Sequence, residues 1–271
     1  MPRALLFAAI FAQSACAQAR FHVPEGGISI PMQDVGGRPL VDLLINGKGP
    51  FPFILDTGAS ATVIDNALVA ELSLNTPLRE VRMGDAVIEN LPAYPFRGLA
   101  GLGGDRPPRG VLSAAAFPGY LLTLDYPARK ITLRRGELPA PDQRRVFEYD
   151  DRDPLPMVPL QLPGRLYKVH VDSGSPGGLM LPLRFLDELK LTEKPVDSGR
   201  ARTVAGEFAL KTAPVEGTIS LGEYPLDLPR VTFSDLRPGP APGPGNIGYQ
   251  VLRAFILTID SKNRRLKFER P

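Results

Sequence analysis

Two short segments of the chain place a carboxyl group directly after a run of apolar residues. They are Phe53-Ile54-Leu55-Asp56-Thr57-Gly58 and Val169-His170-Val171-Asp172-Ser173-Gly174. Two carboxyl groups held about 3 Å apart cannot both ionise, because like charges repel, and such a pair shares one proton. The ionised member can take a proton from a water molecule while the protonated member donates one. Asp56 and Asp172 are therefore candidates for a single acid–base site.

The segments around these aspartates recur in the same order, which indicates an internal duplication. Their alternating apolar and β-branched residues favour strands, and each copy also has one short helix-like segment, 65–72 or 182–189. The matching strand-like pairs are 41–45 and 158–162, 110–113 and 245–248, 120–125 and 255–260, and 130–133 and 265–268. The aspartates are thus expected at corresponding places in two β-rich halves.

The composition fits two compact lobes. The 271 residues are enough for two lobes of about 100–150 residues each, and the 43% apolar content allows packed cores. The 30 prolines and 27 glycines favour turns and short strands over long helices. The segment 139–155 combines prolines with a cluster of charges, a composition that packs poorly and is typical of a connection between lobes. We therefore predict a mainly β protein with lobes at 20–138 and 156–271, joined by a linker at 139–155.

The N-terminus has the pattern of a secretory signal peptide at 1–19. Arg3 supplies a positive charge, 4–12 is apolar, and Ala17-Gln18-Ala19 is a small-residue cleavage pattern. The alternative is a buried N-terminal helix. Cleavage would give an exported protein, periplasmic or secreted, and would remove Cys16, the only cysteine. No other apolar run approaches the roughly 20 residues needed to cross a bilayer, so no stable membrane insertion is expected after cleavage.

Charge and residue content also limit the ligands that this chain can hold. The net charge of +3 comes from scattered residues without the basic block of a nucleic-acid surface, so no nucleic-acid partner is expected. The two histidines, His22 and His170, and the single cysteine are too few for a zinc site, and no metal is expected. The glycines within 98–104 break the spacing of nucleotide-binding loops and are typical of a flexible loop.

With these motifs the sequence resembles the retropepsin-like aspartic peptidases, specifically the bacterial type with two lobes in one chain. The resemblance rests on Asp56-Thr57-Gly58-Ala59, on Asp172-Ser173-Gly174-Ser175, and on the family's apolar-apolar-glycine element, here Asn246-Ile247-Gly248. It covers nearly all of the chain after the signal segment. The first-lobe counterpart of that element, Val111-Leu112-Ser113, has serine in place of glycine, and we expect this serine to shift the chain slightly behind the first aspartate loop.

The resemblance implies a two-lobed pepsin-like or retropepsin-like fold, mainly β with a few short helices. It also implies hydrolysis of peptide bonds at acidic pH by a water molecule between Asp56 and Asp172. The implied substrate is a peptide or protein, and no metal or organic cofactor takes part. Because one chain holds both halves, a monomer is expected to suffice. The titration belongs to the pair, so the acid and base roles are not assigned to individual aspartates.

The neighbours of the two aspartates suit this role. Gly58 and Gly174 let the backbone turn tightly and approach the carboxyl groups closely. The resemblance implies that Thr57 and Ser173 form hydrogen bonds across the lobe interface and fix the two loops together. The hydroxyl of Ser175 is able to exchange a hydrogen bond with the nearby aspartate.

The second half carries extra residues, after its helix-like segment, that the first half lacks. They include 201–210, whose alternation around a central glycine favours a β-hairpin. The family places the flap that covers its substrate here, so the resemblance implies substrate contacts by Val204, Gly206 and Phe208. It also implies that the flap of the first lobe is truncated. An ordinary surface hairpin is the alternative.

Three other interpretations account for parts of this pattern. Two surface Asp-Gly turns are the simplest, but burying an aspartate at the end of an apolar strand is unfavourable for a mere turn. Asp172-Ser173-Gly174 also resembles the nucleophile loop of trypsin-like serine peptidases, which need a histidine base well upstream. Neither His22 nor His170 has that context, so we reject this mechanism. A weakly active or inactive peptide-binding protein on the same fold stays open, favoured by the truncated flap and Ser113 and opposed by the two aspartates.

Overall fold

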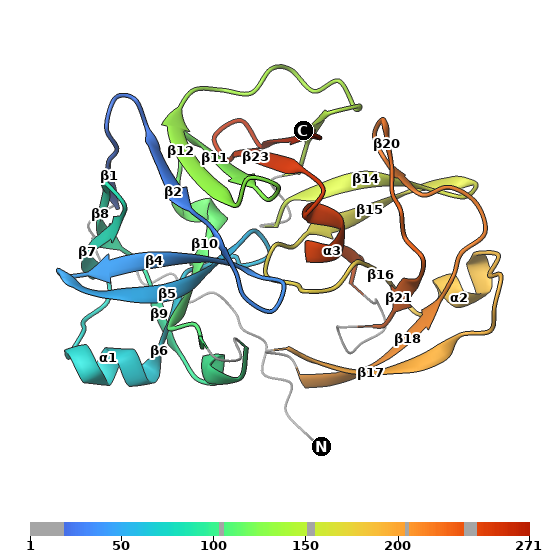
Figure 1. The fold of residues 1–271 in the computed structure, drawn as a ribbon, viewed down its shortest axis with the longest axis horizontal. Coiled ribbons are helices and arrows are strands. Elements are labelled where there is room, and N and C mark those ends of the chain that lie inside the picture. Colours follow the sequence, from blue (N-terminus) through green and yellow to red (C-terminus); the bar gives the residue numbers. More distant parts are fainter. Residues whose placement is uncertain (1–18, 103–105, 151–154, 204–205, 236–242) are drawn as a thin grey trace.

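The computed structural model describes residues 19–102, 106–150, 155–203, 206–235 and 243–271, which form two β-rich lobes (Figure 1). The predicted fold class, a mainly β two-lobed fold of the aspartic-peptidase kind, is confirmed. The predicted signal peptide at 1–19 lies outside the described residues except for Ala19, and it stays a prediction. Within the described ranges, no helix is both long and apolar enough to cross a membrane.

The first lobe is built on a nine-stranded sheet. Its strands are β1 (Arg20–His22), β3 (Gln33–Asp34), β4 (Pro39–Ile45), β5 (Lys48–Asp56), β6 (Val63–Asp65), β7 (Leu78–Met83), β8 (Ala86–Leu91), β9 (Tyr94–Phe96) and β10 (Gly110–Ser113). They join in the order β1-β8-β7-β4-β5-β10-β6-β9, with β3 on β4. Helix α1 (Asn66–Leu72) and the short 3-10 helices η1 (Leu99–Leu102) and η2 (Ala114–Ala116) complete the lobe.

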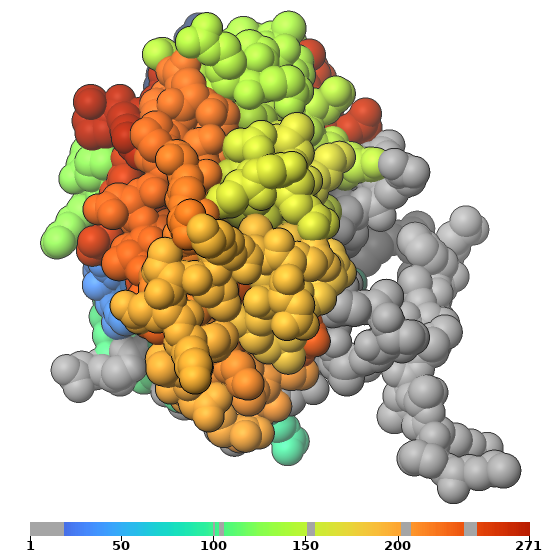
Figure 2. Space-filling model, turned by 90° about the vertical axis from the view of Figure 1, so that its right-hand side faces the viewer, coloured from blue at the N-terminus to red at the C-terminus, as the bar shows by residue number. Residues whose placement is uncertain are grey.

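The second lobe repeats this plan with a second nine-stranded sheet. Its strands are β14 (Met157–Leu162), β15 (Arg165–Val171), β16 (Leu179–Leu181), β17 (Val196–Thr203), β18 (Gly206–Ala213), β19 (Ser220–Leu221), β20 (Tyr224–Pro225), β21 (Val231–Phe233) and β22 (Asn246–Ile247). They join in the order β17-β18-β21-β16-β22-β15-β14-β19-β20, and the helices are α2 (Phe185–Glu188) and α3 (Tyr249–Leu252). Figure 2 shows the outer face of this lobe, which the yellow and orange parts of the chain form.

A third sheet of six strands joins the two lobes, and the sequence did not indicate it. Its strands are β2 (Ile28–Pro31), β11 (Tyr120–Asp125), β12 (Lys130–Arg135), β13 (Val146–Glu148), β23 (Ile256–Asp260) and β24 (Arg265–Glu269), in the order β13-β24-β23-β11-β12-β2. The antiparallel pairing of β11 with β23 sets Thr123 opposite Thr258, so the closing strand of one half lies against that of the other. The predicted lobe ranges therefore share this sheet (Figure 1).

The end of strand β5, which leads to Asp56, is apolar and buried on both faces. At the end of β5, Phe53 and Leu55 belong to the main core, whereas Ile54 packs on the other face with Leu40, Leu99 and Val111. All three β5 residues are at most 2% exposed. Burial on both faces fixes the strand ends firmly, since a shift of one residue would exchange the two faces.

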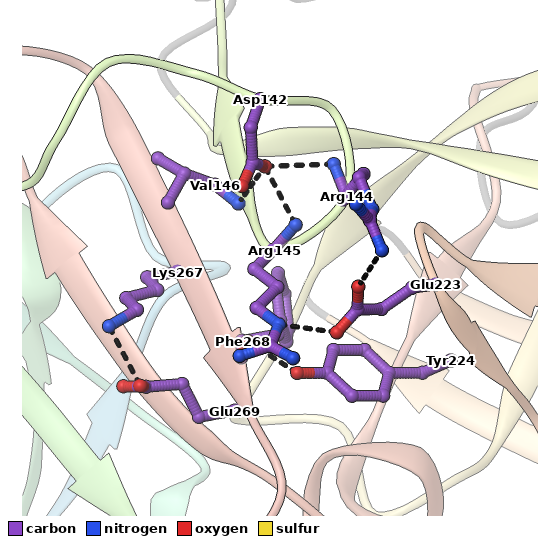
Figure 3. Close-up of polar contacts among 9 residues, drawn as sticks. All are labelled: Asp142, Arg144, Arg145, Val146, Glu223, Tyr224, Lys267, Phe268 and Glu269. Carbon is purple, nitrogen blue, oxygen red and sulfur yellow. Dashed lines mark hydrogen bonds and ion pairs between the residues drawn. The ribbon is translucent and has the colours of Figure 1, made fainter.

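The predicted linker packs against the shared sheet at one short strand, β13. Within 139–150, β13 pairs with β24, and Val146 and Phe147 are 2% and 1% exposed. The carboxylate of Asp142 fixes the turn before β13 by accepting hydrogen bonds of 2.9, 2.8 and 2.8 Å from the amides of Arg144, Arg145 and Val146 (Figure 3). The expectation of a poorly packed segment is wrong only for Val146 and Phe147, because a short strand lies among the charges, whereas 139–140, 142–145 and 148 are exposed.

Removing the turn carboxylate by Asp142→Ala is expected to lower the free energy of unfolding by about 1 kcal/mol, since three backbone amides lose their acceptor. These hydrogen bonds lower the pKa of Asp142 to about 2. Arg144 and Arg145 also tie the turn to the second lobe through ion pairs with Glu223 (Figure 3). Limited proteolysis should cut the variant within the linker sooner than the parent. The control is Asp125→Ala, which removes a single turn contact; equal linker cleavage in all three proteins would contradict the prediction.

Candidate active site

The loops that follow β5 and β15 meet at the boundary between the lobes. A Cβ atom added to Gly58 would lie 2.7 Å from Oδ1 of Asp172, and one added to Gly174 would lie 2.6 Å from Cγ of Asp56. Each glycine therefore lies against the aspartate of the other lobe, where only a residue without a side chain fits. The structure thus brings both aspartates and both glycines into one site.

Parallel strand pairs position the two aspartates. Ser113 of β10 lies opposite Asp56 of β5, and Ile247 of β22 lies opposite Val171, the residue before Asp172. In each lobe, the strand that carries the aspartate pairs with a strand from much later in the same half, β10 in the first lobe and β22 in the second. Each carboxyl group is therefore held by two motifs of its own half. The backbone at each aspartate is therefore fixed by a sheet rather than by a free turn.

Thr57 and Ser173 exchange hydrogen bonds across the lobe boundary, the contact that the resemblance implies. The amide of Thr57 donates to Ser173 Oγ at 2.9 Å, and the amide of Ser173 donates to Thr57 Oγ1 at 2.9 Å. Each hydroxyl then donates to a carbonyl of the opposite lobe, Thr57 to Val171 at 2.5 Å and Ser173 to Leu55 at 2.7 Å. Because Thr57 is 2% and Ser173 0% exposed, water does not replace these bonds.

The variant Ser173→Ala is expected to lower the free energy of unfolding by about 2–4 kcal/mol. It leaves the buried amide of Thr57 and the buried carbonyl of Leu55 without their partner, at about 1–3 kcal/mol each. Urea denaturation followed by circular dichroism measures the effect. The matched control is Thr57→Ser, which keeps every one of these hydrogen bonds and loses only a methyl group. A loss in Ser173→Ala no larger than that of the control would contradict the role of this contact.

Burial and mutual repulsion raise the pKa of Asp56. The value moves from 3.8 to about 7, first because the surroundings remove water from the carboxylate and second because Asp172 carries a like charge nearby. The amides of Gly58 and Gly174 donate to Asp56 Oδ1 at 2.6 and 3.2 Å and limit the rise in pKa. Asp56 therefore keeps its proton well above the pH at which an exposed aspartate loses it.

More hydrogen-bond donors stabilise the ionised carboxylate of Asp172 than that of Asp56. Burial raises its pKa as well, but the side-chain amide of Asn246 donates to Oδ2 at 2.9 Å and opposes the rise. The backbone amide of Ser175 acts in the same direction; its hydroxyl forms no hydrogen bond with Asp172 in the described part of the chain, unlike our prediction. The strand register makes Val111 the first-lobe counterpart of Asn246, and valine cannot donate. The donors thus favour negative charge on Asp172 and the proton on Asp56.

Ser113 is accommodated by hydrogen bonds behind the first aspartate loop. In the second lobe, a Cβ on Gly248 would meet the carbonyl oxygens of Ser175 and Gly177, both at 2.7 Å, so glycine is required there. In the first lobe, Ser113 Oγ instead donates to the carbonyl of Ala59 at 2.6 Å. The departure from the family pattern is therefore compensated locally by a hydrogen bond of the serine itself.

The hairpin β17–β18 stands at the edge of the second-lobe sheet (Figure 1). In the first lobe only residues 73–77, all of them described, separate α1 from β7, so that lobe has no equivalent hairpin at this point. Of the predicted flap residues, Val204 lies outside the described residues. Gly206 begins β18, and Phe208 lies opposite Ala201 and is half-buried. Substrate contact by these residues stays a prediction.

Three residues near the aspartates were not proposed from the sequence as site residues. In the sequence, Asn246 stands out only as part of the motif ending in Gly248. Arg38 stands directly before the apolar strand β4, and a charge in that place is its only sequence signal. Tyr126 follows β11 and is 6% exposed; burial first, and then the charges of the two aspartates, raise its pKa and keep its phenol neutral. Across the described residues, no group of three or more His, Cys, Asp or Glu is placed to hold a metal ion.

Fold and site together define a class of protein, a two-lobed β protein with opposed aspartates at the lobe boundary. A family model described as aspartyl protease matches residues 41–78, which contain the first Asp-Thr-Gly motif and the strands on either side of it. This match supports an aspartyl protease family and a hydrolase class for the chain. A comparison with curated proteins gives no match.

Proposed function

We propose that this protein is an aspartic endopeptidase that hydrolyses peptide bonds with a water molecule activated between Asp56 and Asp172. The observation that carries the proposal is the close approach of each loop glycine to the opposite aspartate, which puts two carboxyl groups of raised pKa in one site. Such a pair destabilises a fold, so a structural role alone gives no reason for it. The aspartyl protease family match adds support.

In the proposed reaction the pair starts with one proton. Ionised Asp172 takes a proton from water as the water oxygen attacks the peptide carbonyl carbon, and Asp56 donates its proton to the carbonyl oxygen. The product is a tetrahedral diol, with Asp172 protonated and Asp56 ionised. Asp172 then protonates the leaving nitrogen while Asp56 takes a proton from the diol, the C–N bond breaks, and the pair returns to its starting state.

The proposed mechanism sets the pH range of activity. It requires one proton on the pair, so the rate rises as Asp172 ionises and falls as Asp56 loses its proton near pH 7. These two limits are apparent values of the coupled pair. Activity is therefore expected from acidic pH to just below neutral.

The deciding experiment incubates the mature protein with a peptide library between about pH 3 and pH 8, beside the variants Asp56→Asn and Asp172→Asn. Mass spectrometry identifies new termini, and cleavage in water enriched in oxygen-18 should place one label in each new carboxyl group. Cleavage that survives either substitution would end the proposal of a shared water. The signal-peptide and export predictions are checked in the same samples by the mass of the secreted chain.

The second candidate is a peptide-binding protein with little or no activity, and the one-sided flap favours it. Only the second lobe has the β17–β18 hairpin, so half of the expected cover over a substrate is missing. Under this alternative the parent protein binds peptides without cutting them at any pH. Equal peptide affinity in the parent and in Asp172→Asn, together with no cleavage by the parent, would favour it.

A further inference from the structure

Arg38 links the two lobes beside the candidate site. It lies at the end of the β3–β4 turn in the first lobe, and its side chain is half-buried. Its Nε donates to the carbonyl of Gly174 at 3.0 Å, and its Nη1 donates to the carbonyl of Leu102 in η1 at 3.1 Å. One guanidinium thus holds the second aspartate loop and a loop of the first lobe at the same time.

The peptide unit that Arg38 contacts is the one that serves Asp172. The carbonyl of Gly174 and the amide of Ser175 belong to the same planar peptide group. Arg38 donates to the oxygen of this group. The amide at its other side donates to the backbone carbonyl of Asp172 at 3.2 Å, and it also lowers the pKa of the Asp172 carboxyl. A charged donor on the oxygen polarises the peptide and strengthens its N–H as a donor, since hydrogen bonds in a chain reinforce one another.

The charge of Arg38 is not neutralised by an ion pair within the described residues, because its hydrogen-bond acceptors there are backbone carbonyls. The titratable groups whose charges act on Arg38 are Asp172 and Asp56. Asp34 stands in the same turn as Arg38, and Tyr126 and Tyr249 lie beside these acidic groups. Asp34 accepts hydrogen bonds from the amide of Gly37 and from the hydroxyl of Tyr249 instead. The positive charge therefore acts on both aspartates and lowers their pKa values, while burial, the larger effect, raises them.

The strand register shows that the second lobe has no arginine at the position equivalent to Arg38. Leu40 lies opposite Ile54, two residues before Asp56, and Met157 lies opposite His170, two residues before Asp172. Leu40 and Met157 thus correspond, and Leu155 stands where the first lobe has Arg38. Among the described residues, the loop of Asp56 has no equivalent charged donor, so the arginine adds to the asymmetry between Asn246 and Val111.

We propose that Arg38 is a positioning residue of the aspartate pair: it fixes and polarises the Gly174–Ser175 peptide and so keeps Asp172 as the ionised member. This inference rests on the proposed function for its kinetic consequence, whereas its effect on the titration of the pair does not depend on catalysis. Loss of the arginine removes a positive charge and a loop contact together. The pair then takes up its proton more readily, and both of its apparent pKa values move upward.

The test combines direct titration with kinetics in Arg38→Gln, Arg38→Lys and the control Arg230→Gln. Arg230 also donates to a backbone carbonyl, that of Thr212, but it does not face the aspartates. Carbon-13 NMR of carboxyl-labelled aspartate follows the pair in the absence of substrate. We expect Arg38→Gln to raise the lower apparent pKa by about 1 unit, a roughly tenfold change in protonation at a given pH. Arg38→Lys should shift less because it keeps the charge, and Arg230→Gln should not shift at all.

The kinetic arm measures kcat and KM from about pH 3 to pH 8. In Arg38→Gln the acidic limb of the kcat profile should move upward with the titration, giving a roughly tenfold lower kcat on that limb and little change in KM. A higher KM with an unchanged titration would overturn the proposal and make Arg38 a substrate contact. An unchanged titration in both Arg38 variants would also overturn it. If the parent protein hydrolyses nothing, the titration still decides the role of Arg38; if Arg38→Gln does not fold, Arg38→Lys carries the same comparison.

Discussion

Replacing Asp56 by asparagine is expected to abolish peptide hydrolysis and, at neutral pH, to make the fold more stable. The loss of a group that both donates and accepts a proton should lower kcat/KM by at least about 10³-fold. The fold gains because the variant no longer holds two repelling carboxyls in a buried site, and asparagine keeps an oxygen for the amides of Gly58 and Gly174. Peptide cleavage assays and urea denaturation at pH 7 measure the two effects on the same preparation.

Asp260→Asn is the matched control for this substitution. Asp260 is 1% exposed, and its carboxylate accepts hydrogen bonds from the amide of Leu138 and from the amide and side chain of Asn263. Turning one of its oxygens into an NH₂ group sets donor against donor, so this variant should lose about 1–3 kcal/mol of stability while keeping its activity per folded molecule. If Asp56→Asn were destabilised as much as Asp260→Asn, the aspartate pair would not be under the repulsion that we infer.

The stability of the parent protein is expected to fall as the pH rises from about 4 to 7. The pKa of Asp56 is near 3.8 in the unfolded chain and about 7 in the folded protein, so the folded state holds the extra proton between these limits. Stability therefore decreases with pH across that window, by up to about 4 kcal/mol. The stabilisation of the folded state by the proton on Asp56 is complete below about pH 4 and lost above about pH 7. Most carboxyl groups that are paired with a cation have a lowered pKa, and their stabilising effect increases with pH instead.

Denaturation midpoints at half-unit pH steps measure this dependence, and the difference between the parent and Asp56→Asn isolates the pair. Asp142 serves as an internal check, since its pKa is lowered to about 2 and its stabilising effect is lost only below about pH 4. A parent protein whose stability rises between pH 4 and pH 7 as steeply as that of Asp56→Asn would refute the raised pKa of the pair.

Most of the predicted fold and site followed from the local motifs and from their order along the chain. An aspartate after an apolar strand, a hydroxyl residue and a glycine appear twice, and the register of β10 and β22 places both copies alike. The hydrogen bonds of Thr57 and Ser173 across the lobe boundary were implied by the resemblance to the aspartic peptidases, and the structure shows them. The comparison of the two halves also located the β17–β18 hairpin, since a length difference between repeats is visible without a structure.

Contacts between segments far apart in the chain were not predictable in this way. The side chain of Arg38 contacts Gly174 across the boundary between the lobes. Neither the residues next to Arg38 in the sequence nor its distance from Asp172 along the chain indicates that contact. Asn246 lay within a recognised motif, but its donation to Asp172 depends on the parallel pairing of β15 and β22. Strand β13 was hidden because its three residues are too short for an alternating pattern and stand among charges.

The six-stranded sheet shared by the lobes has a consequence for how the protein works in dilute solution. A site assembled from two separate chains disappears on dilution, whereas here β11 and β23 keep the two halves joined at any concentration. The rate per molecule should therefore be independent of protein concentration. The two joined halves also differ from each other: Arg38 and Val111 lie in the first, and Asn246 and the β17–β18 hairpin lie in the second.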